Sequence, residues 1–67
     1  FSLPSLDDVN IAVYDVNGTH VETLMNEVKT AGYYTVTWKA DSYPTGMYFI
    51  QFRNKDTVKT MKVVLIK

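Results

Sequence analysis

Apolar side chains recur at every second position through most of this chain, and no run of normal helical length interrupts them. The clearest stretches cover residues 9–14, 33–39 and 47–53. A period of two places alternate side chains on opposite faces of an extended strand, so one face can be buried while the other meets water. About five to seven short strands at a spacing of roughly 8–12 residues are typical of a β-sandwich. The pattern therefore predicts an all-β fold with antiparallel strands in two packed sheets.

The size and composition of the chain limit what such a fold can do. With 67 residues there is room for one domain, because domains run from roughly 50 to 250 residues. The absence of cysteine excludes disulfides and thiolate metal sites. Seven basic and seven acidic side chains cancel, so we expect no binding to nucleic acid or anionic membranes. No apolar run approaches the ~20 residues of a membrane helix, so we expect no membrane insertion.

A β-hairpin is predicted near the start of the chain. Its strands are residues 9–14 and about 19–24. Asn17-Gly18 between them is typical of a type I′ turn, because that turn needs positive φ at both central residues. The apolar spacing in the second strand is irregular, so we expect a β-bulge or the end of the strand near Leu24.

The middle of the chain is predicted to cross from one sheet to the other. Residues 25–32 are too few for a helix of ordinary length and end in glycine, so we interpret them as a crossover loop. A strand is expected to follow over residues 33–39, with Tyr34, Val36 and Trp38 facing the core. The threonines on its other face suit an exposed pleat.

Two further strands are predicted at the C-terminal end. A dense cluster of turn residues at 41–46 precedes an aromatic strand at 47–53. A polar tip at 54–56 leads to the last strand, about residues 57–67. Apolar residues occupy both faces of this last strand, so it is either covered on both sides or presents its outer face to a partner.

Two sheets packed face to face would enclose the inward residues of these strands. The predicted core comprises Val9, Ile11, Val13, Val36, Trp38, Tyr48, Ile50, Phe52, Val63 and Leu65. Tyr33, Tyr43 and Phe49 are expected to point outward. Exposed aromatics keep open the alternative that the domain is an accessory module that binds carbohydrate, or a structural appendage, of a secreted enzyme.

The polar residues do not converge on a catalytic or metal site. His20 is the only imidazole, and no partner is spaced for metal binding or proton transfer. Residues 15–18 superficially match the start of a calcium loop, but Thr19 and Asn26 do not match the ligands that such a loop requires further on. The sequence therefore indicates no enzyme, no cofactor and no metal.

Six short motifs follow one another in an order that carries a family resemblance. They are Phe1-Ser2-Leu3-Pro4, Val13-Tyr14-Asp15-Val16-Asn17-Gly18, Val21-Glu22-Thr23-Leu24-Met25-Asn26, Ala31-Gly32-Tyr33-Tyr34-Thr35-Val36-Thr37-Trp38, Tyr43-Pro44-Thr45-Gly46-Met47-Tyr48-Phe49 and Thr60-Met61-Lys62-Val63-Val64-Leu65-Ile66-Lys67. Nearly the whole chain resembles the type A C-terminal sorting domain of the type IX secretion system. It is also similar to the immunoglobulin-like domain of flagellar hook-capping proteins.

The resemblance implies a domain that carries no chemistry of its own. Such domains lie at the C-terminal end of larger secreted proteins of Bacteroidetes-like bacteria, and the translocation machinery recognises them as the cargo crosses the outer membrane. A sortase-like protease then often removes the domain, and the cargo is anchored at the cell surface or released. For this chain the resemblance implies an immunoglobulin-like sandwich over residues 1–67, a covalently linked N-terminal cargo, and transit through the periplasm to the outside.

The resemblance also implies that the first strand is largely truncated. Family members usually begin with a lead-in rich in proline and asparagine, of which only Phe1 to Pro4 remain here. A sandwich without most of its first strand has an unpaired edge. We expect that edge to pair with another copy, a partner or a neighbouring domain.

By the same resemblance, recognition by the translocation and sortase-like machinery is placed in residues 46–52 and 60–67. The residues expected to contact the machinery are Gly46, Tyr48, Lys62 and Lys67. The competing interpretation is that the glycine supplies only a turn and the apolar residues only fill the core. The two lysines are the better candidates for surface contact. Together with Lys59, they also discourage pairing of the sheet edge with other chains.

Overall fold

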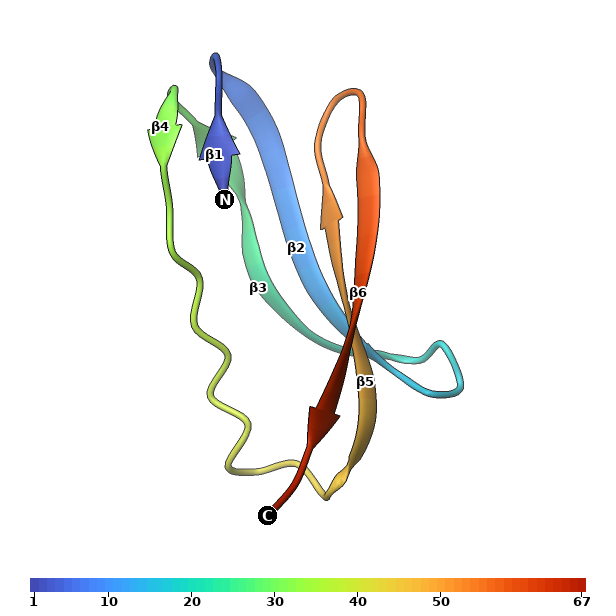
Figure 1. Ribbon diagram of the computed structural model, residues 1–67. Coiled ribbons are helices and arrows are strands. Elements are labelled where there is room, and N and C mark those ends of the chain that lie inside the picture. Colours follow the sequence, from blue (N-terminus) through green and yellow to red (C-terminus); the bar gives the residue numbers. More distant parts are fainter.

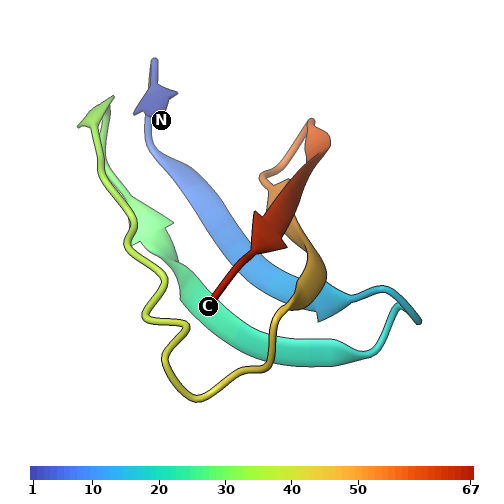
Figure 2. The same ribbon diagram turned by 60° about the horizontal axis from the view of Figure 1, so that its bottom comes forward.

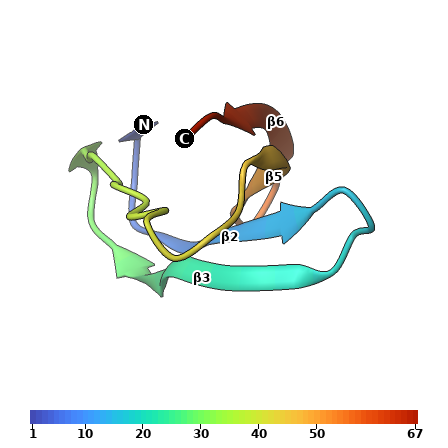
Figure 3. The same cartoon turned by 90° about the horizontal axis from the view of Figure 1, so that it is seen from below.

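The computed structural model describes all 67 residues as a β-sandwich without a helix. The strands are β1 (Ser2–Leu3), β2 (Asp7–Asp15), β3 (His20–Lys29), β4 (Gly32–Tyr33), β5 (Gly46–Arg53) and β6 (Val58–Leu65). β3, β2, β5 and β6 lie in this order in a four-stranded antiparallel sheet, and β1 pairs with β4 in a small second sheet. The large sheet curls, so that β6 approaches the side of the interior on which β1 lies (Figures 1 and 3). The predicted antiparallel sandwich is confirmed.

The turn between β2 and β3 depends on Asp15 and Gly18. The Gly18 N–H donates to the Asp15 carbonyl at 3.0 Å, and the Asp15 carboxylate accepts the N–H groups of Asn17 and Thr19, each at 2.9 Å. Gly18 has φ +81°, whereas no residue other than glycine has positive φ. The predicted type I′ turn is therefore wrong. Four residues, Val16 to Thr19, separate the two strands, and Gly18 among them lies in the left-handed region. The Asp15 side chain stabilises this turn.

The predicted crossover loop at residues 25–32 is wrong for most of its length. β3 continues to Lys29 because β2 already begins at Asp7, and the early residues of β2 pair with the last residues of β3. Only Thr30 and Ala31 separate β3 from β4. Gly32, with φ +153°, lies where the chain enters the second sheet, in a region of backbone conformation that favours glycine.

The irregular apolar spacing around Leu24 is a β-bulge, as predicted. Ile11 pairs with Met25 and Ala12 pairs with Thr23, which leaves Leu24 as the extra residue of β3. Leu24 and Met25 are half-buried and both pack against the core. The bulge thus lets two consecutive side chains contribute to one face, which a regular strand does not allow.

Residues 34–40 show the predicted alternation, but beyond Tyr34, which bonds to Phe1, they have no neighbouring strand. Tyr34, Val36 and Trp38 are half-buried, and the residues between them are exposed. β4 itself is only two residues long, and beyond it the chain runs extended and alone (Figure 2). The prediction for residues 33–39 therefore identified the inward-facing side chains correctly. It was wrong that these residues form a paired strand, because pairing requires a second strand beside them.

The core is small and is centred on β2. The buried residues are Leu3, Val9, Ile11, Ala12, Val13 and Tyr48. The other predicted core residues, Val36, Trp38, Ile50, Phe52, Val63 and Leu65, are half-buried rather than enclosed. The inward direction of the predicted set is thus confirmed, while the second sheet is too small to cover it completely.

The turn geometry predicts that Gly18→Ala destabilises the domain by about 1 kcal/mol. The Cβ of alanine crowds the following carbonyl oxygen in the left-handed conformation that Gly18 adopts. Gly46→Ala is the matched control. A Cβ at Gly46 meets the Tyr48 ring at 3.9 Å, which is an ordinary contact, and its φ is not in the left-handed region. Urea unfolding followed by circular dichroism measures both. Equal midpoints for Gly18→Ala and the wild type would contradict the assigned turn.

Candidate recognition surface

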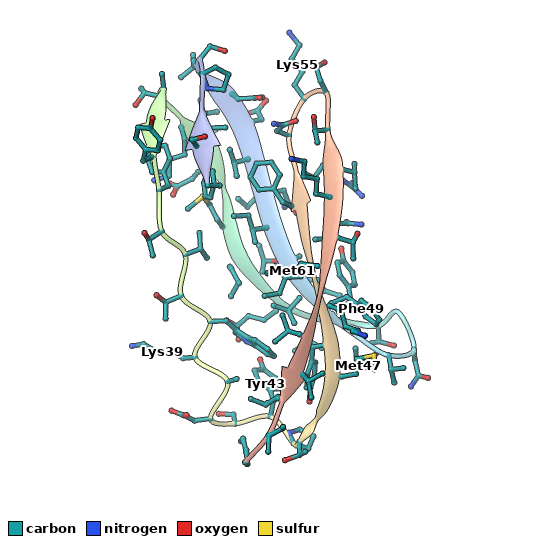
Figure 4. All side chains as sticks on the ribbon, viewed as in Figure 1. Lys39, Tyr43, Met47, Phe49, Lys55 and Met61 are labelled. Atoms are coloured by element: carbon teal, nitrogen blue, oxygen red, sulfur yellow. The ribbon has the colours of Figure 1, made fainter.

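β5 and β6 present one row of side chains to the interior and the other row to the outside. Tyr48 is buried, so its neighbours Met47 and Phe49 lie on the opposite face of the sheet. Figure 4 shows these two side chains directed away from the interior. The cross-strand register pairs Met47 with Val64 and Phe49 with Lys62. We call Met47, Phe49, Lys62 and Val64 the outer hairpin face.

An aromatic row extends the outer hairpin face across the whole sheet. Tyr14 of β2 lies opposite Phe49 on one side and opposite His20 of β3 on the other. The Tyr14 and His20 rings meet edge to face, with centroids 5.7 Å apart. His20 Nε2 also lies 2.9 Å from the Thr23 hydroxyl. His20 therefore forms the end of this surface row.

Apolar groups remain exposed on and beside the outer hairpin face. Val64 is 57% exposed and Ile66, at the end of the chain, is 80% exposed. Isolated exposed apolar residues are normal, but contiguous ones can mark a contact surface, and aromatic residues and methionine are enriched at interfaces. Apolar residues on both faces of the last strand were the signal in the sequence for this surface. Phe49 and Met47 were not among the predicted contact residues.

The C-terminal residue is fastened to the turn that precedes β5. The Lys67 N–H donates to the Thr45 hydroxyl at 3.2 Å, and its ammonium group donates to the Asp41 carbonyl. Lys67 is exposed, but its charged group is thus held against the domain. Its backbone lies close to the start of β5 at Gly46, which pairs with Leu65.

An aromatic cluster supports this corner from inside. The rings of Trp38, Tyr43 and Tyr48 lie 5.2–6.4 Å apart. The Tyr48 hydroxyl donates to the Pro44 carbonyl, and the Tyr43 hydroxyl donates to the Glu22 carboxylate, both at 2.7 Å. The prediction that Tyr43 points outward is wrong, because its hydroxyl bonds to an acceptor on β3 while its ring packs on the tryptophan.

The predicted contact residues fall into two groups. Gly46, Tyr48 and Lys67 meet at the corner where β5 begins, and Lys62 lies apart on the outer hairpin face. Tyr48 is buried, so it holds the corner in place rather than offering its side chain to solvent. The direct role of these four residues in recognition stays a prediction.

The remaining charged side chains lie on the surface of the domain. No three side chains of His, Cys, Asp or Glu gather to hold a metal ion. The ion pair between Lys29 and Glu27, at 2.9 Å, is on the surface, and its hydrogen bond raises the pKa of the lysine. The structure contains no helix with the length and apolar character needed to span a bilayer.

The fold defines a small all-β domain without disulfides. The family can be stated directly. The model of the secretion system C-terminal sorting domain matches residues 1–67, so the chain belongs to this family, the sorting tail of type IX secretion. Neither the curated proteins nor the solved structures contain a match to the chain. The family resemblance found in the sequence is confirmed.

The Tyr43–Glu22 hydrogen bond predicts a loss of stability in alkali. Because the protonated hydroxyl donates to Glu22, the pKa of Tyr43 is raised above its ordinary value of 10.0. The unfolded chain releases this proton first, so the contribution of Tyr43 to stability is present below pH 10 and declines above it. Tyr43→Phe should therefore make the free energy of unfolding fall less steeply as the pH rises above 10.

Tyr33→Phe is the matched control for this measurement, since Tyr33 is 91% exposed. This substitution should leave the loss of stability at alkaline pH unchanged. Urea unfolding at several pH values gives the comparison. Parallel curves for the wild type and Tyr43→Phe would show that this hydrogen bond is not coupled to folding.

Proposed function

We propose that this domain directs a larger cargo protein across the outer membrane by type IX secretion, and that the machinery reads its folded surface. The family match over residues 1–67 is the observation that carries the proposal. A sorting tail travels through the periplasm attached to its cargo and ends outside the cell or at its surface. The domain acts by being bound and is itself not an enzyme.

The outer hairpin face is the surface best suited to this recognition. Binding energy at interfaces is concentrated in a few anchor residues, often aromatic, surrounded by less important contacts that exclude water. Phe49 with Met47 and Val64 provides apolar area, and Lys62 provides one cation across from Phe49. A domain with a formal net charge of zero has no strong general field, so such a local pattern can set specificity.

The free edge of β6 offers a second mode of binding. β6 pairs only with β5, so the backbone along its other side is open to an added strand. Lys59 and Lys62 are exposed along this strand, and charged side chains on an edge hinder random pairing. A partner with acidic groups beside its own strand would be accepted while another copy of this domain is repelled.

No feature of the structure favours the carbohydrate alternative. Of the three aromatics expected outside, only Tyr33 stands free of the domain, while Phe49 and Tyr43 are half-buried. A stacking platform needs exposed ring faces side by side.

Deletion of residues 60–67 should abolish export of a periplasmic reporter fused to this domain through its natural preceding segment. The deletion removes most of β6 and with it half of the outer hairpin face. Reporter activity in the medium and in the periplasm of a type IX-competent host measures the result. Undiminished export of the shortened fusion would refute the proposed function.

Surface substitutions separate recognition from folding. Lys62→Glu and Val64→Asp, at exposed positions, should each lower export at least about fivefold, the effect expected for loss of an interface anchor. Lys55→Glu, at the exposed tip between β5 and β6, is the matched charge control and should export normally. Circular dichroism on the purified variants checks that they are folded. Equal export by all three variants would exclude the outer hairpin face.

A further inference from the structure

The free edge of β6 runs along an apolar groove on the inner side of the sheet. The groove has a volume of about 550 Å³ and is lined by Lys59, Thr60 and Met61 of β6 and by Ile50 and Phe52 of β5, among others. β6 is paired on one side only. A strand added to β6 would therefore lie beside an apolar hollow as well as beside open backbone.

Met61 is the inward side chain that lies uncovered in this groove. It pairs with Ile50, which packs against the core, so both side chains lie on the inner face, as Figure 4 shows for Met61. Met61 is nevertheless 59% exposed, because no strand lies on the open side of β6. An apolar side chain from an added strand would cover it and remove apolar surface from water.

The register of the β5–β6 hairpin shows which backbone groups of β6 are free. At its tip the Asn54 N–H donates to the Thr57 carbonyl at 2.9 Å, so these two residues belong to a hydrogen-bonded pair. Such pairs alternate with non-hydrogen-bonded pairs along an antiparallel ladder, and this ladder has no register shift. Every second residue of β6 therefore directs its N–H and C=O groups to the open edge, and these residues are Val58, Thr60, Lys62 and Val64.

Two lysines without acidic partners flank Met61 on this edge. Lys59 lies on the inner side with Met61, and Lys62 lies on the outer side. The only ion pair of the domain joins Lys29 to Glu27, so neither lysine of β6 is engaged. An acidic residue opposite either lysine would form a cross-strand charge pair without breaking an existing one.

We propose that the partner of this domain adds an antiparallel strand to β6 and inserts one apolar side chain of that strand into the groove beside Met61. Directly opposite residues share a face of the sheet, so the residue opposite Met61 is apolar and those opposite Lys62 and Lys59 are acidic. Along its own direction the partner strand thus has the order acidic, apolar, any residue, acidic. The inference rests on the proposed function, because it specifies the strand that β6 accepts.

Charge and sequence both argue against a second copy of this chain as the occupant. Two β6 edges that meet would bring the lysines of both copies together, and like charges opposite each other destabilise pairing. No two acidic residues of this chain are three positions apart, so no other segment of a second copy has the required order. The occupant is therefore a strand of a different protein.

A synthetic strand tests this order directly. The probe is the acetylated and amidated peptide Thr-Val-Glu-Ile-Thr-Glu-Thr, which places its isoleucine opposite Met61 and its glutamates opposite Lys62 and Lys59. Amide hydrogen exchange of the full 67-residue chain, followed by NMR with saturating peptide, gives the readout. We expect the amides of Thr60 and Lys62 to exchange at least about tenfold more slowly with the peptide, while the amide of Met61, which already bonds to β5, stays unchanged.

Matched variants and a second peptide provide the controls. Met61→Thr removes the apolar neighbour of the inserted side chain and should weaken peptide binding at least about fivefold. Val28→Thr is the matched control and should bind normally, because Val28 is similarly exposed, 57% against 59%, on the other edge strand, β3. A peptide with lysine in place of both glutamates should also bind at least about fivefold more weakly. Unchanged exchange of Thr60 and Lys62, or equal affinity for the two peptides, would overturn the proposal.

The peptide assay and the export assay can fail independently. Protection of the edge amides together with undiminished export after deletion of residues 60–67 would refute the proposed function and leave β6 as a strand-binding edge. Loss of export on that deletion without protection of the edge amides would support the proposed function and overturn this inference.

Discussion

The packing of β2 between β3 and β5 is the interaction on which the rest of the structure depends. β2 is paired along both sides, and its residues Val9, Ile11 and Val13 are buried. A domain of this size encloses only about 60% of its chain surface, and without disulfides it has no other source of stability of comparable size. Every other strand is held in place through β2 or through a strand beside it.

This arrangement separates stability from recognition. On β5, Tyr48 points inward and holds the corner, while its neighbours Met47 and Phe49 lie on the outer face. Substitutions on the outer side can therefore change binding without removing core contacts, which lets a sorting tail vary its surface while keeping its fold. Lys67 links the last strand to the turn before β5, so the two parts of the predicted recognition region are held together.

Local patterns predicted the direction of side chains well and the pairing of strands less well. Alternation identified the inward residues because it follows from the geometry of a single strand. The extension of β3 to Lys29 depends on Asp7 to Asn10 lying beside it, which no local pattern reveals. Tyr43 was misplaced for the same reason, since its acceptor Glu22 is 21 residues away in the chain. At the turn, Asn17-Gly18 was outweighed by Asp15, whose carboxylate bonds two N–H groups.

The two open edges of the domain differ in how they are protected by charge. The edge of β6 carries Lys59 and Lys62, which keep it from pairing with itself while leaving it open to a complementary partner. The edge at residues 35–40 carries one charge, Lys39, near its far end. Left open, it would invite pairing between copies.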